Sequence, residues 1–164
     1  MTDRFQIRPM DEDEDDRAWA AEFIAERWGG ETIVGHGTVY RPASLPGFVA
    51  WRAGERIGLV TYHLDGDACE IVTIDSQQPG MGVGRELIEA VRHVAQDVGC
   101  RRLWLVTTND NLEALGFYQK RGFALAALHR NALEASRRLK PEIPLVGLHG
   151  IPLRDEIELE MLLE

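Results

Sequence analysis

Glycine recurs at alternate positions in one short stretch of the chain, Gly80 to Gly84. An apolar, strand-like run ends just before this stretch and a helical pattern begins just after it. Glycine allows a tight turn and lets backbone N–H groups approach a ligand closely, while the start of a helix directs its positive dipole end at an anion. The stretch therefore predicts a loop that binds the phosphates of a cofactor.

Two well-known phosphate loops do not match this spacing. A Walker loop requires Lys and then Ser or Thr after its last glycine, whereas Arg85 and Glu86 follow Gly84. A dinucleotide fingerprint, Gly-x-Gly-x-x-Gly, would place Arg85 or Leu87 at its third glycine. A nucleotide-binding enzyme of either kind is therefore disfavoured.

The stretch from Gln77 to Arg85 resembles instead the pyrophosphate loop of the GNAT superfamily of N-acetyltransferases, usually written Arg/Gln-x-x-Gly-x-Gly/Ala. Gly82 and Gly84 match its two glycines best. The sequence departs from the family pattern at Pro79, where Arg or Gln is usual. Gln78 is the neighbouring side chain that could make the phosphate contact instead.

A second stretch resembles the other signature of the same family. Asn111 is followed by Ala114 three residues on and Tyr118 seven residues on, and then by basic residues and Gly122-Phe123. Either signature alone is weak. Both in this order, with one strand between them, make a specific match that covers about residues 68–124.

Hydrophobic periodicity and turn residues predict the elements that position these motifs. We expect strands at 5–8, 48–51, 56–62, 69–74, 103–106, 123–128 and 157–163, and helices at 12–27, 87–98 and around Tyr118. We expect the strand at 103–106 to be buried on both faces. We expect the last strand to have one solvent-exposed face. Residues 32–46 are predicted as loop or short helix.

This order predicts an α/β (α+β) fold whose only parallel step joins the strands at 69–74 and 103–107. The resemblance implies a GNAT-like, mixed and mostly antiparallel sheet of six to seven strands with helices on both faces. In that family a splayed parallel pair at the centre of the sheet receives the pantetheine arm of the cofactor, which pairs as an extra strand would.

Composition limits the partners of the chain. With 18 basic and 27 acidic residues the net charge is −9, which argues against nucleic acid and favours a cationic or neutral acceptor. At 164 residues we expect a single domain, 1–164. Cys69 and Cys100 lack metal-site spacing, so we expect neither a disulfide nor a metal. No apolar leader or membrane-spanning run is present, and we expect a soluble, cytoplasmic protein.

Six acidic residues, 11–16, precede the apolar positions Trp19, Phe23 and Ile24. Carboxylates stabilise the start of a helix by accepting its free N–H groups and by complementing its dipole. We favour this explanation over a patch that attracts an amine.

The resemblance implies an acetyl-CoA-dependent N-acetyltransferase that transfers acetyl to a primary amine of a small molecule or peptide by direct attack in a ternary complex. Tyr118 is our candidate acid for the departing thiolate, although a Tyr near a helix end often only packs. Glu70 is our candidate base, and the alternative is a strand-edge Glu paired with Arg52 or Arg56. His63 is an alternate base.

The cofactor site implied by the resemblance combines the strand before the glycine loop, the loop itself and the helix of the second signature. Backbone N–H groups of the strand around 72–74 would polarise the thioester carbonyl. The expected contacts are Ile71, Val72, Thr73, Ile74, Gln77, Gln78, Gly80, Met81, Gly82, Val83, Gly84, Arg85, Asn111, Ala114 and Tyr118.

Other readings stay open. The chain could be a catalytically inactive CoA-binding sensor module, or a protein N-terminal or lysine acetyltransferase. Residues 129–154 are too many for a simple hairpin before the last strand and are unusually apolar. We hypothesise that this insertion covers the acceptor side, with residues 31–46 as the other wall; extra core or a homodimer contact is the alternative.

Overall fold

The computed structural model describes residues 4–78 and 80–164, which form two compact units. The first unit contains residues 4–32, 41–103 and 163–164, and the second contains Ile33–Tyr40 and Trp104–Leu162. The predicted site residues from Glu70 to Arg85 belong to the first unit, whereas Asn111, Ala114 and Tyr118 belong to the second.

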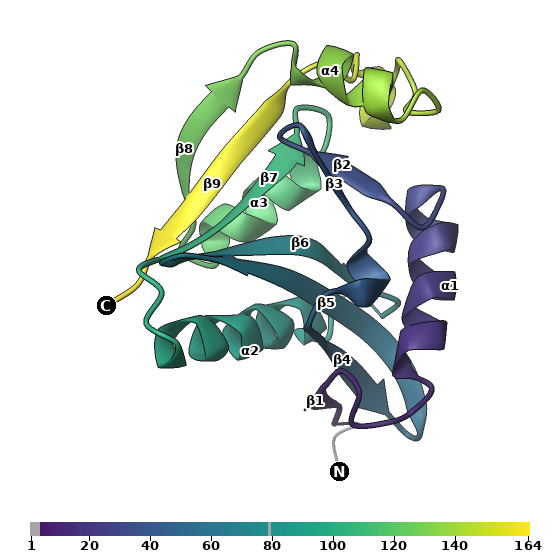
Figure 1. Ribbon diagram of the computed structural model, residues 1–164, viewed down its shortest axis with the longest axis vertical. Coiled ribbons are helices and arrows are strands. Elements are labelled where there is room, and N and C mark those ends of the chain that lie inside the picture. The colour runs from purple at the N-terminus through teal and green to yellow at the C-terminus, as the bar shows by residue number, and fades with distance from the viewer. Residues whose placement is uncertain (1–3, 79) are drawn as a thin grey trace. The chain divides into compact units, whose positions relative to one another are not determined.

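Four antiparallel strands form the sheet of the first unit, as predicted (Figure 1). In spatial order they are β1 (Gln6–Pro9), β4 (Gly47–Arg52), β5 (Glu55–Asp65) and β6 (Ala68–Ser76). The helices of this unit are α1 (Asp16–Trp28), the 3-10 helix η1 (Pro42–Ser44) and α2 (Val83–Asp97). The β4–β5 turn places both Ala53 (φ 51°) and Gly54 (φ 78°) in the left-handed region, which is the geometry of a tight two-residue hairpin.

Helices α1 and α2 pack on opposite faces of these strands. Gly58 on β5 faces α2, because a Cβ there would lie 3.0 Å from Val83 Cγ1. The next residue, Leu59, points to the other face and pairs with Asp75 of β6. Arg27 of α1 donates to the Asp75 carboxylate at 3.2 Å. The prediction of helices on both faces is therefore confirmed.

The acidic block contributes to tertiary structure rather than to a simple helix cap. Helix α1 begins at Asp16, four residues later than predicted, and Asp15 at its N-cap makes no side-chain cap hydrogen bond. The Asp16 carboxylate is only 1% exposed and accepts the backbone N–H groups of Asp11 and Asp13. It also pairs with Arg56 of β5 at 2.9 Å. The acidic block is therefore held by Arg56, which is 40 residues away from Asp16 in the chain. The pattern of neighbouring residues cannot reveal such a partner.

The second unit combines strands β2 (Ile33–Gly35), β3 (Thr38–Tyr40), β7 (Arg102–Thr108), β8 (Ala124–His129) and β9 (Glu156–Leu162) with helices α3 (Leu112–Lys120), α4 (Ala132–Leu139) and η2 (Leu148–Gly150). Strands β2 and β3 form a two-stranded hairpin where loop or short helix was predicted. These three-residue strands are too short to show a periodic pattern, and the turn at His36-Gly37 closes them with two positive φ angles.

The main sheet has the strand order β1-β4-β5-β6-β7-β9-β8. Strand β7 starts within the first unit, where Arg101 N–H donates to Asp67 O at 2.6 Å. Because helix α2 connects β6 to β7, these two neighbours run parallel in an otherwise antiparallel sheet. The predicted mixed fold of six to seven strands with one parallel pair is confirmed, and the sheet has seven strands.

The outer faces of two strands differ from expectation. On β7, Leu103 and Leu105 are buried, but Trp104 and Val106 on the opposite face are only half-buried. The β2–β3 hairpin lies on that face, with the His36 ring 5.0 Å from the Trp104 ring. On β9 the expected wet face includes Glu156, which is 3% exposed because its carboxylate accepts the His36 backbone N–H at 3.1 Å. The unpredicted hairpin explains both differences.

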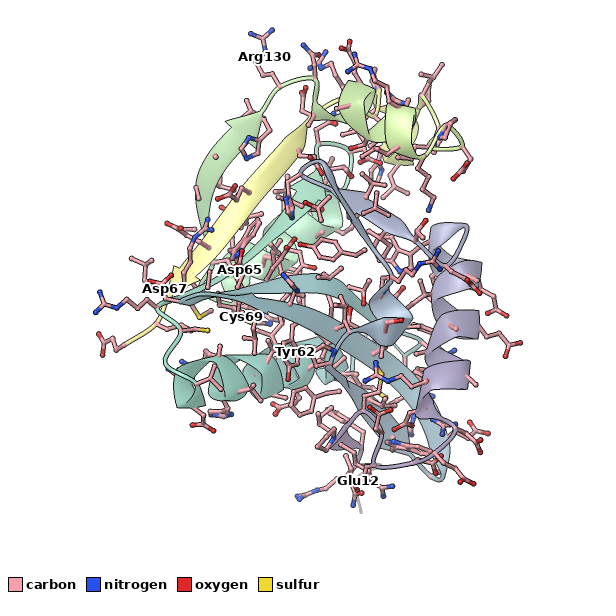
Figure 2. The ribbon with its side chains drawn as sticks, in the orientation of Figure 1. Glu12, Tyr62, Asp65, Asp67, Cys69 and Arg130 are labelled. Carbon is pink, nitrogen blue, oxygen red and sulfur yellow. The ribbon has the colours of Figure 1, made fainter. Side chains whose placement is uncertain are left out.

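Both cysteines are reduced and buried. Cys69 lies at the start of β6, just after the turn that carries Asp65 and Asp67 (Figure 2). Burial, reinforced by neighbouring Cys100 and Glu70, raises the pKa of Cys69 to about 12. No helix within residues 4–78 and 80–164 is long and apolar enough to cross a membrane, and no group of three or more potential metal ligands occurs there.

We expect Asp16→Ala to lower the free energy of unfolding by about 3 kcal/mol, because it leaves the largely buried Arg56 guanidinium without its buried carboxylate partner. Urea denaturation measures the effect. Asp11→Ala is the matched control, since Asp11 forms an exposed ion pair with Arg17 and its loss should cost far less. Equal losses in the two variants would contradict the assigned role of Asp16.

Candidate functional site

The glycine loop connects the end of β6 to the start of α2. Gly80 (φ 88°) and Gly82 (φ 83°) adopt left-handed conformations that disfavour other residues. A Cβ built at either position meets no atom within 4 Å, so conformation rather than crowding requires glycine, and the surface at both positions is open. Pro79, the departure from the family pattern, lies outside the described residues.

The first turn of α2 presents backbone donors. Gly82 is the N-cap and has no side chain that could occupy them. The first hydrogen bond of the helix runs from Glu86 N–H to Gly82 O at 3.1 Å. The N–H groups of Val83, Gly84 and Arg85 therefore have no acceptor within the helix. Together with the positive end of the helix dipole, they form a site suited to phosphate oxygens.

Arg52 is a functional candidate that sequence reasoning missed in this role. Its guanidinium Nη1, at the end of β4, donates to Gln78 Oε1 and lies 3.4 Å from Met81 Sδ. Gln78 is thereby oriented by a cation, and its N–H donates to Ser76 Oγ at 3.2 Å. The contact adds positive charge to the loop at the point where Pro79 replaces the usual Arg or Gln. No local signal marks it, because 26 residues separate Arg52 from Gln78.

A β-bulge interrupts β6 where the thioester contact was predicted. Thr61 pairs with Thr73, but the next residue of β5, Tyr62, pairs with Ile71. Val72 is therefore an extra residue that lies outside the regular ladder. Thr73, the residue after the bulge, is held by a buried hydrogen bond of 2.7 Å between its Oγ1 and Thr61 Oγ1. Bulges free backbone groups from strand pairing, which the predicted role of residues 72–74 requires.

The two candidate bases are neighbours. Glu70 on β6 lies directly opposite His63 on β5 in the antiparallel register. Opposed residues share a face with Cβ atoms about 5 Å apart. Glu70 is 4% exposed and His63 is half-buried. A buried carboxylate beside an imidazole is an arrangement that can accept and hold a proton.

The alternative role of Glu70, a pair with Arg52 or Arg56, does not fit the register. Arg52 lies opposite Glu55, eight residues along β5 from His63. That separation corresponds to about 26 Å along a strand. Arg56 uses its guanidinium to bind Asp13 and Asp16. The strand-edge explanation is therefore excluded for both arginines.

Helix α3 carries the second signature, in the second unit. The Asn111 side chain caps the helix by accepting the Ala114 N–H at 3.2 Å. Seven residues separate Asn111 from Tyr118, which places them two turns apart on nearly one face. The half-buried Tyr118 ring packs edge-on against Phe123, with centroids 5.8 Å apart. Packing thus orients the ring.

Two basic residues, Lys120 and Arg121, lie at the end of α3. Lys120 is exposed. The Arg121 guanidinium stacks over the Phe117 ring at 4.7 Å, and its Nε is buried with no hydrogen-bond partner in the described part of the chain. Arg85, on the first turn of α2, is exposed beside the glycine loop.

The insertion before β9 is buried only in part. Leu133 of α4 is 3% exposed and adds to the core, whereas the apolar side chains of Leu145, Val146 and Leu148 are 72%, 58% and 51% exposed. Helix α4 of this insertion contacts β2, so the two segments proposed as acceptor walls meet within the second unit. Figure 2 shows Arg130 projecting from the connection between β8 and α4.

Comparison with known proteins agrees with these motifs. The model of the acetyltransferase (GNAT) family matches residues 1–123. The uncharacterized protein YdhI of Bacillus subtilis (strain 168) is 45% identical over 137 residues, which are 83% of this chain and 86% of that protein.

Two solved structures have a similar fold. One is an acetyltransferase of Bacillus subtilis in complex with CoA, with a TM-score of 0.69 and 19% identity over 98% of this chain and 100% of that chain. The other is a GNAT family acetyltransferase from Elizabethkingia anophelis with acetyl-CoA bound, with a TM-score of 0.70 and 20% identity over 99% of this chain and 100% of that one. Because the family model matches three quarters of its length, the chain belongs to the acetyltransferase (GNAT) family.

Proposed function

We propose that this protein is an N-acetyltransferase that transfers the acetyl group of acetyl-CoA to a primary amine of a small molecule or peptide, by direct attack in a ternary complex. The observation that carries the proposal is the arrangement of the chain from Val72 to Arg85. A bulged strand leads into an open glycine loop and then into a helix whose N-cap makes no side-chain hydrogen bond. These features offer backbone donors to a pyrophosphate and a bulged strand to a pantetheine arm. CoA contains both groups.

Residues 71–74 and the glycine loop supply binding and polarisation in this proposal. N–H groups at the start of α2 hold the pyrophosphate, while a backbone N–H near the bulge donates to the thioester carbonyl as it gains negative charge. Arg52 adds a cation beside Gln78. Asn111 and Ala114, at the start of α3, contribute the remaining contacts that the family motif implies.

Proton transfer is assigned to side chains. An aliphatic ammonium has a pKa near 10, so the attacking nitrogen must lose a proton at neutral pH. Glu70 and its neighbour His63 are the groups proposed to accept it. The nitrogen then forms a bond to the acetyl carbon, the carbon–sulfur bond breaks, and the Tyr118 hydroxyl donates a proton to the leaving thiolate.

The acceptor is proposed to be cationic or neutral, because the net charge of −9 repels anions. Transfer to a protein N-terminus or to a lysine side chain would use the same chemistry. A screen of amines, peptides and proteins for CoA release distinguishes these acceptors. A protein that binds CoA but releases none with any acceptor would instead be a sensor module.

We expect Gly84→Val to weaken CoA binding by at least an order of magnitude, because a branched side chain on the first turn of α2 would occupy the space of the phosphate oxygens. Isothermal titration calorimetry with CoA measures this effect. The matched control is Ala90→Val, six residues further along the same helix, which should bind CoA as the wild type does. Unchanged affinity in a folded Gly84→Val protein would remove the loop from the cofactor site.

Tyr118→Phe should lower kcat about 10²- to 10⁴-fold and leave the Kd of CoA nearly unchanged, because the hydroxyl acts when sulfur departs rather than when the cofactor binds. Packing against Phe123 is retained by the phenyl ring. Steady-state kinetics and CoA titration measure the two quantities. A kcat within about twofold of wild type would restrict Tyr118 to packing.

Glu70→Gln tests which group is the base through the pH dependence of kcat/KM. If Glu70 accepts the proton, the acidic limb should disappear with the carboxylate. If His63 accepts it, or if the amine loses its proton in solution, the limb should persist in this variant. An unchanged limb would therefore exclude Glu70 as the base and point to one of these two alternatives.

A further inference from the structure

Three side chains at the end of β7 and the start of α3 each bind the insertion that precedes β9. These are Asn109, Asp110 and Glu113, and their partners lie between residues 147 and 155. All belong to the second unit. The insertion is therefore fastened to the N-terminal end of α3, the helix of the second family signature.

Asp110 is the most buried of these three side chains. It is 5% exposed, and its Oδ2 accepts the Leu148 N–H at 2.8 Å while Oδ1 accepts the Thr108 hydroxyl. A Cβ on Gly147 would lie 2.1 Å from Asp110 Oδ2. Gly147 has φ −102°, which any residue adopts, so the position requires glycine for space and not for conformation. The carboxylate and the loop backbone have complementary shapes.

Asn109 fixes the far end of the same segment. Its Nδ2 donates to Pro152 O at 2.9 Å, and its Oδ1 accepts the N–H groups of Arg154 and Asp155 at 3.0 and 2.9 Å. Glu113 bonds the His149 ring at 2.8 Å, but both side chains are largely exposed. Asn109 and Asp110 therefore provide the strong attachment, and the Glu113–His149 contact contributes less.

The segment from 143 to 153, which we call the acceptor loop, is also ordered internally. The Arg137 guanidinium donates to the carbonyl oxygens of Ile143, Pro144 and Leu153. Leu153 N–H donates to Leu145 O at 3.0 Å, and Gly147 N–H donates to Ile151 O at 2.8 Å. Ordering a loop costs conformational entropy, yet this one leaves Leu145, Val146 and Leu148 more than half exposed. Such a surface is expected where a ligand covers it.

We propose that Asp110 is a positioning residue that couples the acceptor loop to α3, so that CoA binding further restrains this loop as the acceptor side of the site. This inference rests on the proposed function, which places Asn111 and Ala114 of α3 against the cofactor. Asp110 immediately precedes Asn111, and the Leu112 N–H donates to Asp110 O at 3.1 Å. Restraint of the start of α3 by CoA is therefore transmitted to residues 147–148 through one carboxylate.

Hydrogen–deuterium exchange with CoA as the probe tests the coupling without knowledge of the acceptor. In the wild type, saturating CoA should slow amide exchange in residues 143–153 by about fivefold or more, a usual size for coupling between sites. Asp110→Ala should still bind CoA but lose this slowing. Asp110→Asn should retain it, because the amide oxygen can accept the Leu148 N–H. His149→Ala is the control that leaves the coupling intact.

Gly147→Ala tests the contact between Asp110 and the acceptor loop by changing the loop residue. Its Cβ clashes with the Asp110 carboxylate, so this variant should also lose the CoA-dependent slowing. In Asp110→Ala/Gly147→Ala the nearest clashing atoms are absent, so the second substitution should destabilise the protein less than it does alone. Additive losses of stability would contradict the contact.

The outcomes separate this inference from the function on which it rests. CoA binding with unchanged loop exchange in the wild type would overturn the coupling alone. Slowing that persists in Asp110→Ala would assign the coupling to other residues and overturn the role of Asp110. Failure of the wild type to bind CoA would overturn the proposed function and this inference together.

Discussion

The constraint on which the site depends is the need to hold an anion with backbone N–H groups. A strand must end, turn and enter a helix within a few residues, and every donor must stay free of side chains. Gly80 and Gly82 meet this requirement with left-handed backbone conformations, and α2 then begins with unused donors. The rest of the first unit supports this junction: β5 holds Gln77 through Ile57 O, and Gly58 lets Val83 approach the sheet closely.

In the proposed site, the backbone and the side chains have different roles. In the proposed function, binding of a phosphorylated cofactor requires few specific side chains, because the donors belong to the main chain and Val72 lies outside the regular ladder. Side chains are needed only where protons move, and the candidates are Glu70, His63 and Tyr118. We propose that acceptor recognition belongs to segments outside the two family motifs, the β2–β3 hairpin and the acceptor loop.

Features encoded by neighbouring residues could be predicted from the sequence. The glycine loop, the Asn111 cap, the seven-residue spacing to Tyr118 and the amphipathic α2 all express rules that act within a few turns. The four antiparallel strands and the parallel step followed from alternation, turn glycines and one crossover helix. Features that depend on distant residues could not be predicted. Arg52 reaches Gln78, Arg56 reaches Asp16 and Glu70 faces His63 only once the strands have paired.

The most direct test of the central claim is a ¹H–¹⁵N NMR titration with CoA and, separately, with pantetheine, which lacks the pyrophosphate. The account predicts that CoA shifts the backbone amide signals of Gly82, Val83, Gly84 and Arg85 strongly, because their N–H groups meet phosphate oxygens. Pantetheine should leave these four signals almost unchanged. Binding of CoA that leaves the four amides unperturbed, or equal shifts with both ligands, would contradict the account.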